Sequence, residues 1–449
     1  MGKISFGEIN KSLLYILLMS ISKVLNQYIY GFTYIKCFHT MNIYQFLYNG
    51  IIDDKKQNFP RHRVFDPFFS YIGVIFLSFI FIRYKKDENL NKILIPVSEG
   101  GSLHHSNLYL TLIYTKNKNY LKDKKGFLFY LGVIIMWIAA ENLLLIYVDI
   151  FQDLDFWFFE LIFVSFIFRK IFSVKINSHQ KLGMAISIIV GSLLKIYNIS
   201  LSLNSSTFYA KNHALISFCI FYFILIIMRS YVNTHIKTFL DLKYISHRVL
   251  LMSYGIIGAL LCLFAGIFTS NVPCSEELRN YVCVMDYENK LYYDEIHNYI
   301  ESSENMLVRL IVIILGMITF FSNIYYYSLI IKYYTPIHVI FSFPVQFFIE
   351  KTFLLIFTGA FYSEDLFTEE NQLSKFLLDI SGDIASIIGF LIYLEIIELN
   401  FCNLNYNLKK NIIKRGEKDY IDSIVPQSMP LDDLFEDNSE EDSSSENNN

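Results

Sequence analysis

Residues 126–147 read GFLFYLGVIIMWIAAENLLLIY, and Glu141 is the one charged residue among them. About 20 mainly apolar residues form a helix long enough to cross the hydrocarbon core of a bilayer, which is about 30 Å thick. A backbone inside lipid has no water to bond with, so a segment of this kind must be helical. The stretch therefore predicts a transmembrane helix.

Nine further stretches have the same character, so the sequence predicts ten membrane-spanning helices. They cover 13–34, 65–82, 126–147, 153–168, 182–200, 212–233, 249–269, 306–332, 335–360 and 376–400. The composition agrees, because 53% of the 449 residues are hydrophobic and only 18% are charged. Soluble globular proteins carry about 25% charged residues. We expect an all-α fold, a polytopic membrane bundle of ten transmembrane helices.

The loops assign an orientation to this bundle. Lys and Arg residues are concentrated in the N-terminal segment 1–12, in the loops on the same side and in the tail. Loops rich in Lys and Arg stay in the cytosol. We therefore expect a multi-pass protein of the endomembrane system or plasma membrane with both termini in the cytosol. Residues 201–211 then form a lumenal linker and 270–305 a lumenal loop.

Two kinds of modification are expected on the lumenal side. Cys274 and Cys283 fall in the 270–305 loop, where thiols can oxidise. A disulfide between them and two free thiols are both open. Asn198 and Asn204 begin glycosylation sequons in or beside the 201–211 loop. Both sequons suit the same side of the membrane.

The chain after the last span divides into two parts. Residues 401–424 mix Lys and Arg with Leu and Ile, a pattern typical of a basic amphipathic segment on an anionic membrane surface. Residues 425–449 become acidic and rich in Ser and Asn, a composition that predicts disorder.

The two halves of the membrane portion show weak self-similarity. Glu141-Asn142 in the third span corresponds to Ser322-Asn323 in the eighth. Small residues recur on one face of the fifth and tenth spans, where they let another helix backbone approach. They are Gly183, Ser187, Gly191, Gly382, Ser386 and Gly389. Residues 13–200 and 212–400 therefore predict a 5+5 inverted repeat, because five crossings reverse the orientation of the second half.

Two connections between spans carry a family resemblance. FIFRK at 166–170 and KINSHQKLGM at 175–184 link the fourth and fifth spans. YVNTH at 231–235 and YISHRVLLMSYGIIG at 244–258 link the sixth and seventh. In these stretches the chain resembles the drug/metabolite transporter superfamily, which includes EamA-like, nucleotide-sugar and chloroquine-resistance-type transporters. The resemblance implies a carrier with its substrate site between two inverted repeats.

Polar residues inside the spans are candidates for such a site. A charge at a helix centre costs about 2.5–3.5 kcal/mol on insertion scales, so each asks for a cavity or a partner. The candidate cavity residues are Lys23, Asn26, Gln27, Glu141, Asn142, Glu160, Asn323, Glu350 and Asp383. The alternative is a set of ion pairs that only hold the bundle together. Lys195, Arg229 and Arg309 are expected to reach the interface instead.

These patterns favour a secondary transporter of a small solute, such as a metabolite, a nucleotide sugar or a drug-like compound. The alternative is a polytopic receptor or scaffold that does not transport. No hydrolase, zinc-protease or nucleotide-binding motif occurs, so we expect neither an enzyme nor a cofactor or metal site. The expected partners are the lipid bilayer and the solute. A homodimer stays open, and dispersed basic residues give no support for nucleic-acid binding.

Overall fold

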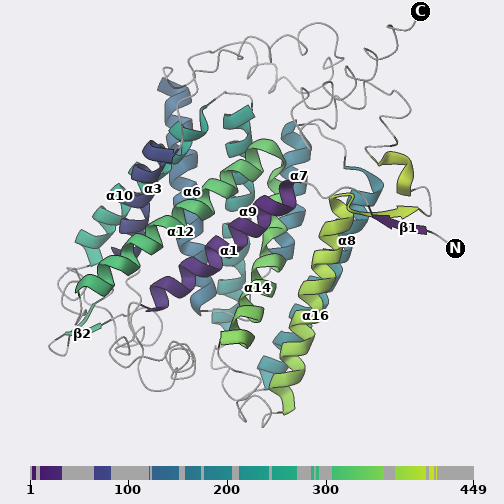
Figure 1. Cartoon of the computed structure of the whole chain (residues 1–449). Coiled ribbons are helices and arrows are strands. Elements are labelled where there is room, and N and C mark those ends of the chain that lie inside the picture. Colours follow the sequence, from purple (N-terminus) through teal and green to yellow (C-terminus); the bar gives the residue numbers. More distant parts are fainter. Residues whose placement is uncertain are drawn as a thin grey trace, which may run out of the picture.

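The computed structural model describes most of the helical part of the chain. The described residues are 3–6, 11–32, 65–81, 121, 124–150, 157–172, 176–204, 212–241, 245–269, 285–287, 290–292, 306–357, 370–400, 404–408 and 411. These residues are almost entirely helical. The expected all-α class is therefore confirmed for them, and the long helices lie side by side (Figure 1).

The first half of the chain contains the helices α1 (Lys11–Phe32), α3 (Phe65–Phe81), α6 (Lys124–Ile150), α7 (Trp157–Phe172) and α8 (Ser178–Asn204). The second half contains α9 (Asn212–Asp241), α10 (His247–Thr269), α12 (Met306–Tyr333), α13 (Pro336–Ile340), α14 (Ser342–Phe357) and α16 (Glu370–Tyr393). Short strands are β1 (Lys3–Phe6), β2 (Met285–Tyr287), β3 (Lys290–Tyr292) and β4 (Ile397–Asn400), and a 3-10 turn, η7, covers Leu404–Asn407.

Four described helical segments are long and apolar enough to cross a membrane. They are Lys124–Leu144, Cys219–Leu240, His247–Phe268 and Leu310–Tyr333, and they match the third, sixth, seventh and eighth predicted spans. Shorter apolar helices cover Ser12–Asn26 and Phe65–Phe81. These helices support a membrane protein, whereas the full count of ten stays a prediction.

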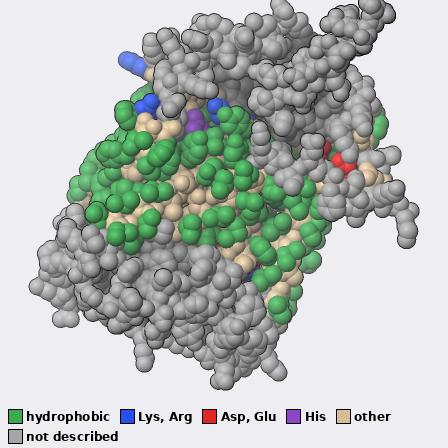
Figure 2. Space-filling model, viewed as in Figure 1, with side chains coloured by type: hydrophobic (Ala, Val, Ile, Leu, Met, Phe, Trp, Pro, Cys, Tyr) green, Lys and Arg blue, Asp and Glu red, His purple; other side chains and the backbone are tan. Residues whose placement is uncertain are grey.

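The outer surface fits a lipid environment. Phe79, Phe166 and Phe264 on three different helices are 64%, 65% and 67% exposed. Figure 2 shows a continuous hydrophobic band across the helices, with Lys, Arg and His side chains at its upper edge. Such an extensive apolar surface is typical of contact with a membrane or a partner.

Helices from the two halves of the chain are interleaved in the bundle. α1 packs on α12 and α14, while α9 packs on α6 and α7. α3 packs on α12, and α6 packs on α10. α7 contacts α8, and α14 contacts α16. Two further contacts between the halves, α3 with α10 and α8 with α16, join the second helix of one half to the second of the other and the last helix to the last.

The contact between α8 and α16 is built on small residues. A Cβ atom added to Gly389 would lie 2.7 Å from the carbonyl oxygen of Gly183 and 2.6 Å from Ser187 Oγ. The hydroxyl of Ser187 donates to the carbonyl of Ser386 at 3.1 Å. Further along the seam, Gly382 faces Leu194 of α8. The two backbones therefore approach closely without a side chain between them.

Replacing Gly183 by Ala is expected to lower the stability of the purified protein. The new methyl group would meet the carbonyl oxygen of Gly389 and lie 2.8 Å from the backbone nitrogen of Tyr393, neither of which can rotate away. Overpacking of this kind costs about 1–3 kcal/mol. Thermal unfolding in detergent measures the loss. Gly132→Ala is the control, because nothing lies within 4 Å of its added Cβ. Equal stability of the two variants would contradict the close seam.

The ninth predicted span is interrupted in the structure. α13 starts with Thr335 as its N-cap and Pro336 in its first turn, and it ends at Ile340. α14 then begins at Ser342, with Pro344 in its own first turn. A proline fits the first turn of a helix but removes a donor from its interior, so the two prolines favour two short helices in succession.

The tenth predicted span, 376–400, is wrong at its C-terminal end. α16 stops at Tyr393, and Glu395 has a positive φ of 62°. Residues Ile397–Asn400 form β4, which pairs antiparallel with β1 so that Phe6 lies opposite Ile397. Glu398, which falls inside the predicted span, therefore lies on a strand. Ile397 and Leu399 continue the apolar residues of the preceding helix, and only the partner strand at the N-terminus distinguishes a strand from a helix end here.

Several sequence predictions concern residues that the structure does not describe. Cys274 and Cys283 lie outside the described residues, as do most of the 401–424 segment and the whole 425–449 tail. Asn198 lies within α8, and Asn204 is its last residue, although neither side chain is described. The disulfide and both glycosylation sites stay predictions.

Candidate functional site

A buried ion pair joins α9 to α7. Arg229 donates from Nη2 to Glu160 Oε2 at 2.8 Å and from Nε to Glu160 Oε1 at 2.9 Å. The side chains are only 3% and 2% exposed. Glu160 lies in the first turn of α7, where the helix dipole favours a carboxylate. The two-point geometry matches the planar guanidinium to the planar carboxylate, the strongest form of such a pair.

The prediction that Arg229 reaches the interface is therefore wrong. The sixth span was placed at 212–233, which puts Arg229 near its end, but α9 continues to Asp241. The polar run from Asn233 to Lys237 lowers the hydropathy there, although its side chains are buried within the protein. Arg229 thus lies about three turns before the C-terminal end of α9. In the sequence, the only indication of this pairing was that Glu160 lies within another predicted span.

Glu141 is a second carboxylate beside Arg229. Its Oε1 lies 4.0 Å from Arg229 Nε, and its side chain is 24% exposed. This is the only ion pair of Glu141 among the described residues. It is long because Arg229 directs its shorter bonds to Glu160. Asn233 donates to Glu160 Oε1 at 3.4 Å and accepts a hydrogen bond from the Tyr327 hydroxyl. We call Glu141, Glu160, Arg229, Asn233 and Tyr327 the charged cluster.

Aromatic rings surround the charged cluster. The guanidinium of Arg229 lies 4.4 Å from the ring centre of Phe343, and Lys23 Nζ lies 4.8 Å from the same ring. The indole ring of Trp137 stacks on Tyr327 at 5.2 Å and lies 4.2 Å from Tyr254. Cations are attracted to such ring faces, so the Phe343 ring stabilises both Arg229 and Lys23.

The remaining polar candidates of the first half lie on several helices. Asn142 donates to the hydroxyl of Tyr71 at 2.8 Å and so links α6 to α3. Asn26 donates to the carbonyl of Gly316 at 3.1 Å and to Thr319 at 3.2 Å, which links α1 to α12. Gln27 is in α1, but its side chain is not described.

The candidates of the second half have varied surroundings. Asn323 on α12 and Glu350 on α14 are half-buried. Asp383 on α16 binds Lys351 on α14 at 2.6 Å, in a pair whose side chains are 11% and 25% exposed. The structure thus brings Glu141 and Glu160 together in one cluster, while Asp383 belongs to a separate ion pair.

The two ends of the bundle differ in how tightly they are packed. Residues 232–240 of α9 are all buried, and so are residues 334–346 of α13 and the start of α14. The following residues of α14, 347–352, are half-buried. We call the tightly packed end, where α9 and α12 finish and α13 begins, the closed end. Glu160, at the start of α7, lies toward the opposite end.

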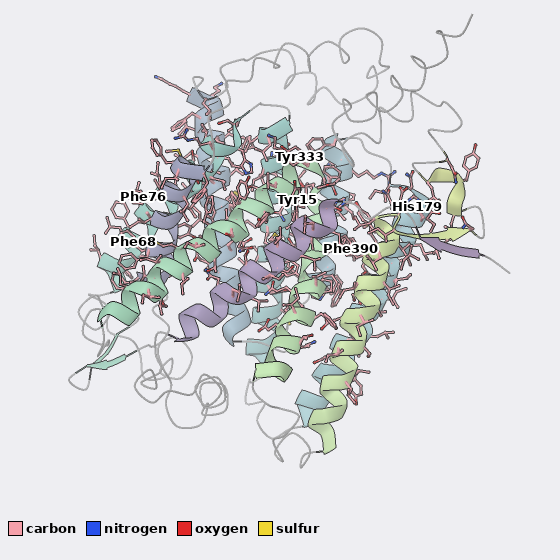
Figure 3. All side chains as sticks on the ribbon, in the orientation of Figure 1. Tyr15, Phe68, Phe76, His179, Tyr333 and Phe390 are labelled. Atoms are coloured by element: carbon pink, nitrogen blue, oxygen red, sulfur yellow. The ribbon has the colours of Figure 1, made fainter. Side chains whose placement is uncertain are left out.

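Polar and aromatic contacts seal the closed end. Lys237 donates from its buried ammonium group to the carbonyl of Lys332 at 2.7 Å. Thr335 Oγ1 and His338 Nδ1 share a hydrogen bond of 2.7 Å. Phe341 stacks on Phe390 at 4.7 Å, and Phe390 is marked in Figure 3. α9, α12, α13 and α16 are joined at this end.

A second set of contacts ties the chain ends to the closed end. His179 of α8 hydrogen-bonds to Glu395 after α16 at 3.0 Å, close to the β1–β4 pair (Figure 3). Tyr15 of α1 stacks on Tyr326 of α12 at 6.2 Å. The seal therefore includes helices from both halves of the chain.

The charged cluster carries groups that can bind charged or polar solutes. It offers a half-buried carboxylate, a guanidinium and amide and hydroxyl groups, and all of its residues except Glu160 lie in segments long and apolar enough to cross a membrane. No set of three His, Cys, Asp or Glu side chains with metal-binding geometry occurs in the part of the chain that the structure describes. Comparison with models of protein families finds no match, and neither does comparison with curated proteins. The assignment to the class of membrane proteins rests on the fold itself, a helical bundle with four segments long and apolar enough to cross a membrane.

Proposed function

We propose that the chain is a secondary transporter that moves a small solute by alternating access. The observation that carries this proposal is the charged cluster: two carboxylates and an arginine at the junction of α6, α7 and α9. Ionisable residues within membrane helices are costly and mark solute or proton pathways in most cases. A metabolite, a nucleotide sugar and a drug-like compound are all compatible with the groups present.

The packing of the helices supports a 5+5 inverted repeat. The helices α1, α3, α6, α7 and α8 can be paired in order with α9, α10, α12, α14 and α16, and most of their contacts then have a counterpart. The α9–α12 and α10–α12 contacts have no comparable counterpart among the described residues. The α1–α12 contact becomes α9–α6, α1–α14 becomes α9–α7, and α3–α12 becomes α10–α6. The α7–α8 contact becomes α14–α16, whereas α3–α10 and α8–α16 map onto themselves. A two-fold relation of this kind is common in secondary transporters, including those of the drug/metabolite transporter type.

The uneven packing of the bundle supports alternating access. Burial of residues 334–346 at the closed end, with looser packing of 347–352, is what a carrier open toward one side requires. The Lys and Arg side chains at the upper edge of the apolar band suit a cytosolic placement of the closed end (Figure 2). Transport would then need the seal around Lys237 and His338 to separate.

Uptake into liposomes tests the proposal. The purified chain is reconstituted, and a panel of radiolabelled anionic, zwitterionic, cationic and neutral solutes is offered on the outside. We expect saturable accumulation of at least one solute, inhibited by the same solute without label. Protein-free liposomes and liposomes with heat-unfolded protein are the controls. Absence of uptake for every solute, at several pH gradients, would contradict transport.

A receptor or scaffold is the second candidate. The Lys351–Asp383 and Arg229–Glu160 pairs favour it, because a protein that only holds its helices together is expected to pair its buried charges. A scaffold predicts that neutralising both partners of the Arg229–Glu160 pair leaves every activity of the protein unchanged. A transporter predicts loss of flux in the same variant.

A further inference from the structure

The most exposed group of the charged cluster is a carboxylate with an incomplete set of partners. Arg229 makes two bonds shorter than 3 Å to Glu160 but only a 4.0 Å contact to Glu141. Arg229 is thus the shared counter-ion of two carboxylates, Glu160 and Glu141, and it is closer to Glu160. A carboxylate held among membrane helices with a partial counter-ion favours the arrival of a cation.

Four aromatic side chains form a continuous group that joins the charged cluster through Tyr327. We call Tyr71, Trp137, Tyr254 and Tyr327 the aromatic group. Tyr71 accepts a hydrogen bond from Asn142, the residue after Glu141, and Tyr327 donates to Asn233 of the charged cluster. Trp137 precedes Glu141 by four residues on α6, so both lie on one face of that helix. Tyr71 lies 5.3 Å from Tyr254, and Trp137 contacts both Tyr254 and Tyr327, which makes the group continuous.

Trp137 supplies a second, independent sign of a ligand. Its indole N–H is fully buried and has no hydrogen-bond partner among the described residues. A buried donor without an acceptor costs about 1–3 kcal/mol, so such groups are rare in folded proteins and need an explanation. An oxygen atom of a bound solute would satisfy this donor one turn away from Glu141.

We propose that Glu141 and the aromatic group bind a compact organic cation, with its ammonium group at the Glu141 carboxylate. This inference rests on the proposed function and names the class of solute for the same site. A carboxylate combined with Tyr and Trp faces attracts ammonium groups by charge and by the ring quadrupole. A polyanion such as a nucleotide sugar would instead meet the Glu141 carboxylate.

Trp137 offers a direct readout of binding. The chain contains only two tryptophans, Trp137 and Trp157, so the Trp157→Phe variant leaves Trp137 as the sole indole fluorophore. Choline is the probe, and 3,3-dimethylbutan-1-ol, which has the same shape without the charge, is its neutral match. We expect a saturable change in Trp137 emission with choline and none with the alcohol. Calorimetry of the unaltered chain with both compounds repeats the comparison without the substitution.

A matched pair of variants locates the site. Glu141→Gln is expected to weaken choline binding about tenfold or more, a loss of at least about 1.4 kcal/mol. Asp379→Asn removes a carboxylate from α16, which packs on α8 and α14, and is expected to leave binding within about twofold. Equal responses to choline and the alcohol, or choline binding unaffected by Glu141→Gln, would overturn the inference.

The uptake assay separates this inference from the proposed function. Choline binding that depends on Glu141, without uptake of any solute, would support the cation site and contradict transport. Uptake of an anionic or neutral solute by a protein that does not bind choline would support transport and overturn the cation site.

Discussion

Glu160→Gln is expected to destabilise the protein more than any other single substitution considered. It leaves the guanidinium of Arg229 buried, 3% exposed, without the carboxylate that binds it at 2.8 and 2.9 Å. Removing one partner of a buried ion pair costs about 3–5 kcal/mol, because the remaining charge loses its compensation. We expect a large drop in the midpoint of thermal unfolding in detergent and a low yield of monodisperse protein.

A double variant distinguishes this explanation from a general loss of packing. Combining Glu160→Gln with Arg229→Met removes both charges, so it is expected to recover most of the stability lost in Glu160→Gln. Asp383→Asn is the matched control. Its partner Lys351 is 25% exposed and can reach water, so a loss of only about 1 kcal/mol is expected. A double variant as unstable as the single one would contradict the pairing of Glu160 with Arg229.

Glu141→Gln is expected to abolish uptake while leaving the fold intact. Glu141 is 24% exposed and contacts Arg229 only at 4.0 Å, so its contribution to stability is within about 1 kcal/mol. Its carboxylate is nonetheless the most exposed charge of the cluster and, in the proposed function, the group that meets the solute. We expect uptake by Glu141→Gln liposomes to fall to the level of protein-free liposomes.

Glu350→Gln provides the comparison for this result. Glu350 lies on α14, in the half-buried stretch 347–352, and was predicted as a candidate cavity residue. Because Glu350 is not part of the charged cluster, we expect Glu350→Gln to retain uptake. Full uptake by Glu141→Gln, measured on protein with an unchanged unfolding midpoint, would exclude Glu141 from the transport step.

Hydropathy was enough to predict the fold class but not the position of every helix end. Residues 126–147 are apolar over a length that only a spanning helix explains, and α6 covers them with a few residues added at each end. The sixth span was ended too early, at 233, because four of the five residues from Asn233 to Lys237 are polar. Their side chains are buried against other helices, and a single sequence does not show such tertiary contacts.

The candidate site was predicted in part for the same reason. Glu141 and Glu160 were identified because a carboxylate in an apolar stretch is costly, and that argument is local. Arg229 was assigned to the interface since its span was placed too short. Tyr327 and Phe343 gave no signal at all, because aromatic residues are abundant throughout the chain and only the fold brings these two rings to Arg229.

The central claim is that two oppositely inserted groups of five helices surround a charged site within the membrane. An electron cryo-microscopy map of the full chain in lipid nanodiscs tests it most directly. The account predicts ten crossings, a two-fold relation between residues 13–200 and 212–400, and the Arg229–Glu160 pair inside the lipid layer. A map with an odd number of crossings, or with Arg229 at the membrane surface, would contradict it.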